Sequence, residues 1–145
     1  MRVMVIMEGN RHTESEAQPS EALMREMMAF NEELTRAGVM LAGEGLKPTK
    51  YGKRVLFDGD KAPMVVDGPF TEAKEIVAGF WIWQVDSVEQ AVEWAKRVPN
   101  TDGFHTGVQI RPIFGMEDFE NITPEIIEQV NRLSAETGNY AAEKA

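Results

Sequence analysis

The sequence predicts an α+β fold of the ferredoxin-like type, with strands and helices in the order β-α-β-β-α-β, an inserted β-hairpin and a C-terminal helix. Three observations predict it. Short apolar segments alternate with amphipathic helical stripes, an Asp-Gly turn separates two apolar arms, and the strongest strand segments are apolar on both faces. We expect a ferredoxin-like domain over residues 1–115 and a helical extension over residues 116–145.

The first half of the chain contains two predicted strands around one helix. Residues 2–8 are rich in Val, Ile and Met and are expected to form a strand, and the polar residues 9–18 are expected to form a loop. Ser20 is a good N-cap for a helix, and Gly38 is a good residue to end it. A second strand is expected over residues 39–46.

The second half of the chain continues the same alternation. Turn residues, capping residues and prolines mark the ends of each element. In order, they predict a hairpin over 55–66, a helical turn over 71–75, a strand over 76–85, a helix over 88–98, a strand over 108–114 and a helix from Pro124 to Gly138-Asn139. We expect the tail, residues 140–145, to be frayed.

Apolar residues on both faces of the predicted strands indicate that both faces of the sheet are covered. Helices cover one face of a ferredoxin-like unit, so the second face would expose a broad apolar surface, which soluble monomers rarely do. We therefore expect a homodimer in which two sheets pack face to face and close as a shared barrel. The C-terminal helix could reach across to the partner.

Composition excludes several classes of function. The 145 residues carry 15 Lys and Arg against 24 Asp and Glu, a net charge of −9 that disfavours contact with nucleic acid, because phosphate repels it. Cysteine is absent, which excludes a disulfide frame, a thiolate metal site and a thiol nucleophile. No apolar run is long enough for a membrane span and no signal peptide is recognisable, so we expect a cytoplasmic protein.

One extended motif resembles a known family. It consists of residues 67–75 (Asp-Gly-Pro-Phe-Thr-Glu-Ala-Lys-Glu), Gly79-Phe80, residues 89–95 and Pro99, together with Gly43-Glu44-Gly45-Leu46 after the first helix. This pattern, which extends to about residue 115, is similar to the DGPF branch of the YCII-related family. The resemblance implies a ferredoxin-like dimeric α+β barrel whose activity is mostly unestablished.

The resemblance also carries two expectations about function. YCII-related members proper are suspected enzymes because of a His–Asp pair in a cleft, with the histidine on the first helix; residues 20–37 of this chain contain no histidine. DGPF-type proteins are also found linked with extracytoplasmic-function sigma factors. The resemblance therefore implies either a small-molecule enzyme or binder, or a non-catalytic regulatory protein that works with a sigma factor.

Three carboxylates around the motif are the candidate catalytic groups. Asp67 heads the Asp-Gly-Pro-Phe turn, where it either accepts backbone hydrogen bonds or acts as a general base. Glu72 and Glu75 would share one face of a helical turn, where they either hold a proton near neutral pH or form a solvated charge cluster. The functional alternative is carboxylate acid–base chemistry in a cleft of the dimer, without a cofactor. Binding of a divalent cation by these carboxylates is a weaker alternative, and no metal site is assigned.

Five further residues are candidates for ligand binding. Arg111, within the last strand, needs an ion partner or the carboxylate of a ligand. Glu44 lies between two glycines, and Trp81 either lines a pocket or belongs to the core. Lys74 accompanies the acidic cluster, and His105, in a polar loop, is either a proton-transfer group or simply solvated.

Overall fold

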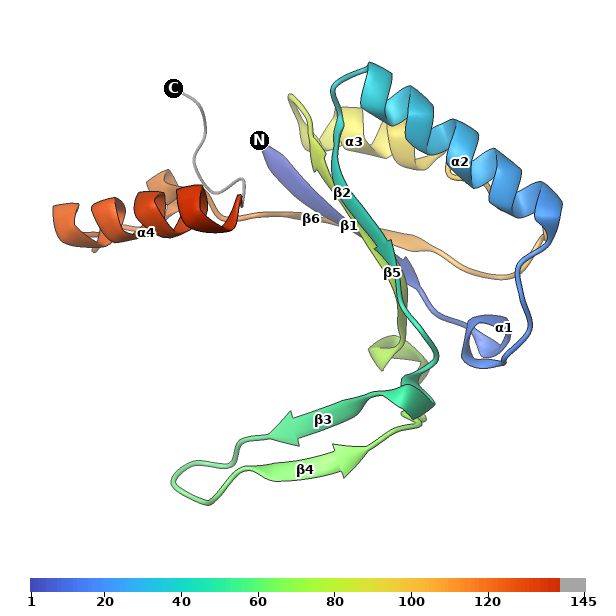
Figure 1. Ribbon diagram of the computed structural model, residues 1–145, viewed down its shortest axis with the longest axis horizontal. Helices are drawn as coiled ribbons and strands as arrows, with labels where there is room; N and C mark the ends of the chain where they lie inside the picture. Colours follow the sequence, from blue (N-terminus) through green and yellow to red (C-terminus); the bar gives the residue numbers. More distant parts are fainter. Residues whose placement is uncertain (139–145) are drawn as a thin grey trace.

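The computed structural model describes residues 1–138 and shows a four-stranded antiparallel sheet with two helices packed on one face (Figure 1). The strands are β1 (Arg2–Glu8), β2 (Met40–Gly45), β5 (Val77–Gln84) and β6 (Val108–Pro112), in the spatial order β2-β5-β1-β6. Helix α2 (Glu21–Arg36) connects β1 to β2, and helix α3 (Val88–Ala95) connects β5 to β6. This order confirms the predicted ferredoxin-like unit.

The core lies between the sheet and these two helices. Val3 on β1 lies opposite Trp83 on β5, Val5 lies opposite Trp81, and all four side chains are buried. Phe30 of α2 meets both tryptophans edge-on, with ring centroids 6.1 and 6.3 Å away. Alternation along the strands directs this row of side chains towards the helices and so fixes α2 against the sheet.

Residues 9–18 correct the sequence prediction, because they do not form a loop throughout. Arg11–Glu14 form a short helix, α1, which Asn10 caps. The side chain of Asn10 accepts a hydrogen bond from the N–H group of Thr13, whose hydroxyl accepts one from the N–H group of Asn10. A single turn held by its caps lacks the apolar periodicity by which longer helices are predicted.

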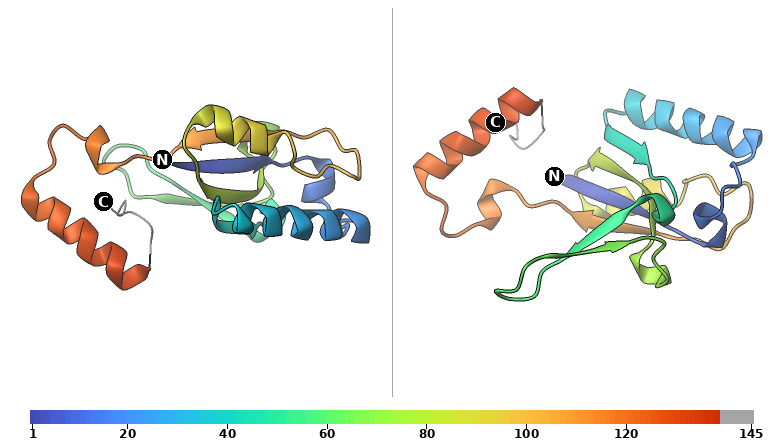
Figure 2. Two further views of the ribbon diagram at one scale, coloured as in Figure 1. Left: turned by 90° about the horizontal axis from the view of Figure 1, so that it is seen from above. Right: turned by 60° about the horizontal axis from the view of Figure 1, so that its bottom comes forward.

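Two elements stand away from the sheet and its helices, as the views of Figure 2 show. The inserted hairpin consists of β3 (Lys53–Leu56) and β4 (Met64–Asp67), and the C-terminal helix is α4 (Pro124–Thr137). Short 3₁₀ turns occupy three connections: η1 (Thr49–Tyr51), η2 (Ala73–Glu75) and η3 (Met116–Asp118). The predicted Asn139 end of the last helix and the tail over 140–145 lie outside the described residues. Among residues 1–138, no helix is long and apolar enough to cross a bilayer.

The second face of the sheet is turned away from α2 and α3. By alternation, this open face carries half-buried apolar side chains from the two central strands: Met4, Ile6, Ala78, Phe80 and Ile82. Glu44 on β2 and Arg111 on β6 lie at its two edges and are exposed. Sheet-to-sheet packing with a second copy stays a prediction for this face.

Candidate functional site

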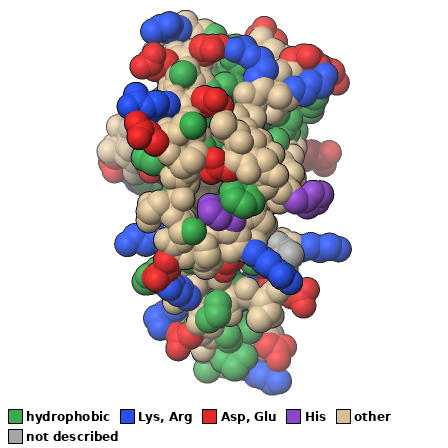
Figure 3. All heavy atoms as spheres, turned by 90° about the vertical axis from the view of Figure 1, so that its right-hand side faces the viewer, with side chains coloured by type: hydrophobic (Ala, Val, Ile, Leu, Met, Phe, Trp, Pro, Cys, Tyr) green, Lys and Arg blue, Asp and Glu red, His purple; other side chains and the backbone are tan. Residues whose placement is uncertain are grey.

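A cavity of about 950 Å³ lies at the end of the sheet where β1 and β2 finish and β5 and β6 begin. The segment around α1, the first turns of α2 and the loop after α3 line it, and it opens to solvent. Its walls are mainly apolar, with polar groups interspersed: Met7, Leu23, Met24, Met27, Leu46 and Val98, and Glu8, Asn10, His12, Glu16, Lys47 and Tyr51. Figure 3 views the molecule from the side of α1, where both histidine side chains are visible. A cavity of this size and lining suits a small organic molecule.

His12, a residue of this lining, has a polar atom without a hydrogen-bond partner among residues 1–138. Its ring stacks on Phe104, with ring centroids 4.1 Å apart and planes inclined by 17°. The Nε2 atom is buried, and no group of residues 1–138 makes a hydrogen bond to it. Leaving a buried polar atom unpaired costs about 1–3 kcal/mol. A group that reached this atom and made the missing hydrogen bond would remove this cost.

The loop after α3 brings Asp102 to the same region. Its carboxylate accepts hydrogen bonds from the hydroxyl and the backbone N–H group of Ser20, the N-cap of α2. These hydrogen bonds lower the pKa of Asp102 below its ordinary value, and the charge of a protonated His12 lowers it further. Asp102 is therefore ionised at neutral pH, close enough to His12 for the two charges to interact.

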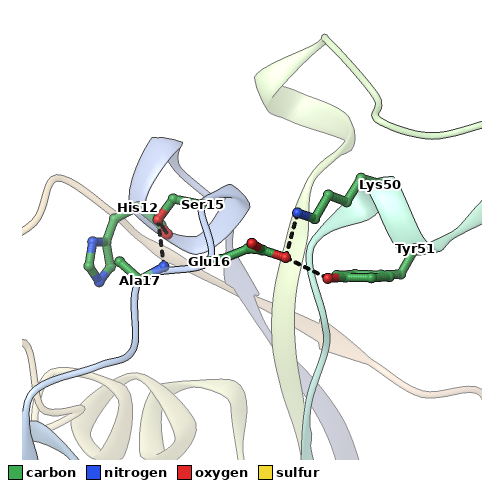
Figure 4. A network of polar contacts seen from close by, with 6 residues as sticks. All are labelled: His12, Ser15, Glu16, Ala17, Lys50 and Tyr51. Carbon is green, nitrogen blue, oxygen red and sulfur yellow. Dashed lines mark hydrogen bonds and ion pairs between the residues drawn. The ribbon is translucent and has the colours of Figure 1, made fainter.

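The segment after α1 is tied to the chain that leads into the hairpin (Figure 4). Glu16 accepts a hydrogen bond from the hydroxyl of Tyr51 and pairs with the ammonium of Lys50, each at 2.6 Å. The hydrogen bond from Lys50, followed by that from Tyr51, lowers the pKa of Glu16, and the bond to Glu16 raises the pKa of both partners. Because the ion pair is exposed, its contribution to stability is small.

The Asp-Gly-Pro-Phe motif has a structural role that can be stated atom by atom. A Cβ atom on Gly68 would lie 1.8 Å from the carbonyl oxygen of Thr49, so only glycine fits there. The hydroxyl of Thr49 donates to Glu14 of α1 at 2.5 Å and accepts from the N–H group of Phe70 at 2.9 Å. The motif thus connects the base of the hairpin to α1, the helix that carries His12.

The three predicted catalytic carboxylates lie at the hairpin and its base, and none lines the cavity. Asp67 pairs with Lys53 across the hairpin at 2.5 Å, and Glu75 pairs with Arg54 at 3.0 Å. Glu72 is exposed just before η2. Over residues 1–138, no three His, Asp or Glu side chains are grouped so that they could hold a metal ion. Proton transfer by the three carboxylates stays a prediction.

The five predicted ligand-binding residues also lie outside the cavity lining. Trp81 is buried in the core. Glu44 and Arg111 occupy opposite edge strands of the open face, so the structure does not bring them together within one copy. Lys74 is exposed in η2, and His105 is exposed in the loop after α3. Ligand binding by these residues stays a prediction as well.

Sequence reasoning missed the two ionisable groups of interest near the cavity. It gives His12 little weight, because His12 lies in a polar segment expected to be a loop, and it does not single out Asp102. One signal was available: the Asn10-x-x-Thr13 spacing is typical of reciprocal capping at a helix start. Nothing comparable marks Asp102, which reaches Ser20 across 82 positions of sequence.

Comparisons with known proteins identify the family. The model of the YCII-related domain matches residues 1–117, which contain the sheet, the hairpin and the cavity. An uncharacterized protein of Rhizobium meliloti (strain 1021) is 27% identical over 93 residues, which cover 64% of this chain and 74% of that protein. A solved structure of 5-chloro-2-hydroxyhydroquinone dehydrochlorinase from Burkholderia phenoliruptrix AC1100, in complex with 2,5-dihydroxybenzoquinone, is 13% identical and has a TM-score of 0.40, covering 83% of this chain and 100% of that chain. That structural likeness is too low to support a conclusion about this chain. The family match over most of the sequence shows that the protein belongs to the YCII-related family.

Proposed function

We propose that the protein binds a small molecule with an apolar body and a hydroxyl group in the cavity beside α1, and that His12 exchanges a proton with that hydroxyl. One observation carries this proposal: His12 belongs to the lining of a cavity of about 950 Å³, and its buried Nε2 atom has no hydrogen-bond partner among residues 1–138. A hydroxyl suits this atom because it can both donate and accept a hydrogen bond.

The cavity supplies the other requirements of such a site. Met7, Met24 and Met27 give it soft, adaptable apolar walls. A neutral imidazole can take the hydroxyl proton on Nε2 and return it. The ligand oxygen becomes an oxyanion in this step, and Lys47, a cation of the same lining, can attract it. Asp102, which is ionised, interacts favourably with the imidazolium that forms.

Two other functions remain predictions beside this one. Carboxylate acid–base chemistry by Asp67, Glu72 and Glu75 requires a ligand at the base of the hairpin rather than in the cavity. A regulatory role with a sigma factor requires a surface for that protein, for which the exposed hairpin and α4 are available. Recovery of a sigma factor with the purified protein would support the regulatory role.

Binding of phenol and of anisole tests the proposed function. The two probes share a ring, but only phenol has a hydroxyl that can donate to Nε2. We expect phenol to bind the native protein about fivefold more tightly than anisole in calorimetric titrations, which corresponds to one hydrogen bond. The variant His12→Phe keeps a ring against Phe104 and removes the nitrogen, so the preference for phenol should disappear.

Two matched variants separate the competing assignments. His105→Asn changes the other histidine, which is exposed, and should leave the preference for phenol unchanged. The double variant Asp67→Asn, Glu72→Gln should also leave it unchanged. If the double variant loses the preference while His12→Phe retains it, the site belongs to the carboxylates and the proposal for His12 is wrong.

We also propose that a second copy of the chain covers the open face of the sheet. The open face carries half-buried apolar side chains at its centre and the exposed Glu44 and Arg111 at its edges. An apolar centre with a charged rim is the arrangement of an interface. Light scattering at micromolar concentration should give twice the mass of 16.3 kDa. Phe80→Lys, at the centre of the face, should shift the particle towards the monomer, and a native protein that remains monomeric would contradict the proposal.

A further inference from the structure

Two apolar surfaces outside the sheet lack an adequate covering. The hairpin surface is the face of the hairpin that carries Val55 and Val65, which are 49% and 60% exposed. Leu56, Met64 and Val66 lie on the opposite face and are exposed too. The helix surface consists of Ile126, Ile127, Val130 and Leu133 on one side of α4. Ile126 is 44% exposed and Leu133 is 45% exposed. Apolar groups gathered on one element in this way mark a site of contact.

Neither element is expected to be stable without such a contact. A two-stranded hairpin is marginal in water unless further strands or a helix cover it. An isolated helix of about 12–15 residues is also marginal, and α4 has 14 residues. The substantial packing contacts among residues 1–138 join the strands to one another and to α2 and α3, and α4 takes part in none of them. Figures 1 and 2 show both elements standing off the sheet and apart from each other.

The sequence around the hairpin surface has an excess of cations and that around the helix surface an excess of acidic groups, and four of the hairpin cations also pair with carboxylates of their own chain. Residues 47–67, around the hairpin surface, contain five cations against three aspartates: Lys47, Lys50, Lys53, Arg54 and Lys61. Residues 117–136, around the helix surface, contain six acidic groups against Arg132 alone: Glu117, Asp118, Glu120, Glu125, Glu128 and Glu136. Opposite potentials steer two surfaces towards each other and suppress contacts of each surface with itself.

We propose that α4 of one copy packs its helix surface on the hairpin surface of a second copy. Both halves of a complementary pair are present in one chain, so a two-fold axis forms the contact twice, which is the arrangement of a closed dimer. In Figure 1 the hairpin and α4 both stand away from α2 and α3. The contact is independent of the ligand proposed for His12.

Cysteine cross-linking between two separately made proteins tests this contact. The chain has no cysteine of its own, so each introduced thiol is unique. Val65→Cys protein and Leu133→Cys protein, carrying tags of different mass, are mixed and oxidised mildly. We expect a disulfide between the two tagged chains. Ala135→Cys is the matched control, because it lies on the opposite side of α4 from Leu133 and should give little of the mixed product.

A second measurement does not depend on oxidation. Leu133→Lys should weaken self-association at least tenfold in light scattering over a dilution series, because it removes a buried apolar side chain from the contact, whereas Ala135→Lys should not. Unchanged tryptophan fluorescence would show that each variant retains its core. Equal yields with Leu133→Cys and Ala135→Cys would overturn the proposal. So would a Val65–Leu133 disulfide that forms only within one chain of the double cysteine variant.

Discussion

Gly68→Ala should destabilise the base of the hairpin and, through it, the wall of the cavity. The new methyl group would overlap the backbone carbonyl oxygen of Thr49, and a backbone atom cannot move aside as the end of a side chain can. Overpacking of this kind costs about 1–3 kcal/mol. Because Thr49 bonds both Glu14 and Phe70, its displacement should also loosen α1 and the ring of His12.

The control for this variant is Gly45→Ala. A Cβ atom on Gly45 would meet nothing within 4 Å, so we expect the free energy of unfolding to stay within about 0.5 kcal/mol of the native value. Urea unfolding and hydrogen exchange of residues 47–70 measure the two variants. If the two alanines behave alike, the close approach at Gly68 does not constrain the motif, and another reason is needed for its glycine.

Trp83→Ala should have the largest effect on stability of any single truncation in the core. The Trp83 side chain has no solvent exposure, and it packs on the Phe30 ring that fixes α2. Removing a buried aromatic ring costs about 3–5 kcal/mol. Urea unfolding followed by circular dichroism measures this loss without relying on the fluorescence of the tryptophan removed.

Phenylalanine variants distinguish the two core tryptophans. The indole N–H of Trp83 is buried and has no partner among the described residues, 1–138, whereas that of Trp81 donates to Asn31 at 2.9 Å. Trp83→Phe therefore removes an unpaired donor, which offsets part of the lost packing, but Trp81→Phe leaves the amide oxygen of Asn31 without its donor. We expect Trp83→Phe to lower the free energy of unfolding less than Trp81→Phe does. The reverse order would show that packing alone determines the loss of stability.

The fold could be predicted from sequence because its determinants are local. Ser20 and Ser87 cap the starts of α2 and α3 by accepting a hydrogen bond from the N–H group three residues further on. Gly38 follows the end of α2 with a positive φ. The continuous apolar runs of β1 and β5 are visible within short windows of the sequence. Helix α1 was beyond this reasoning, since its four residues carry no apolar periodicity and its only signal is the pair Asn10 and Thr13.

The candidate site could not be predicted in the same way, because packing over long distances in sequence creates it. His12 acquires its significance from Phe104, which stacks on it, and from the burial of Nε2. Asp102 reaches the region through Ser20, far away in the chain. The residues that sequence reasoning favoured, Asp67 and Glu75 among them, carry charge in a conspicuous motif, and the structure pairs each of these two with its own cation.

The most direct test of the His12 site uses the fact that the chain has only two histidines. Nuclear magnetic resonance of histidine-labelled protein gives one set of imidazole signals for each, and His105→Asn assigns them. Titration with phenol should change the chemical shifts of His12 until binding saturates, and it should leave the chemical shifts of His105 unchanged. If phenol binds and the His12 signals do not move, or if His105 responds instead, the cavity beside α1 is not the binding site.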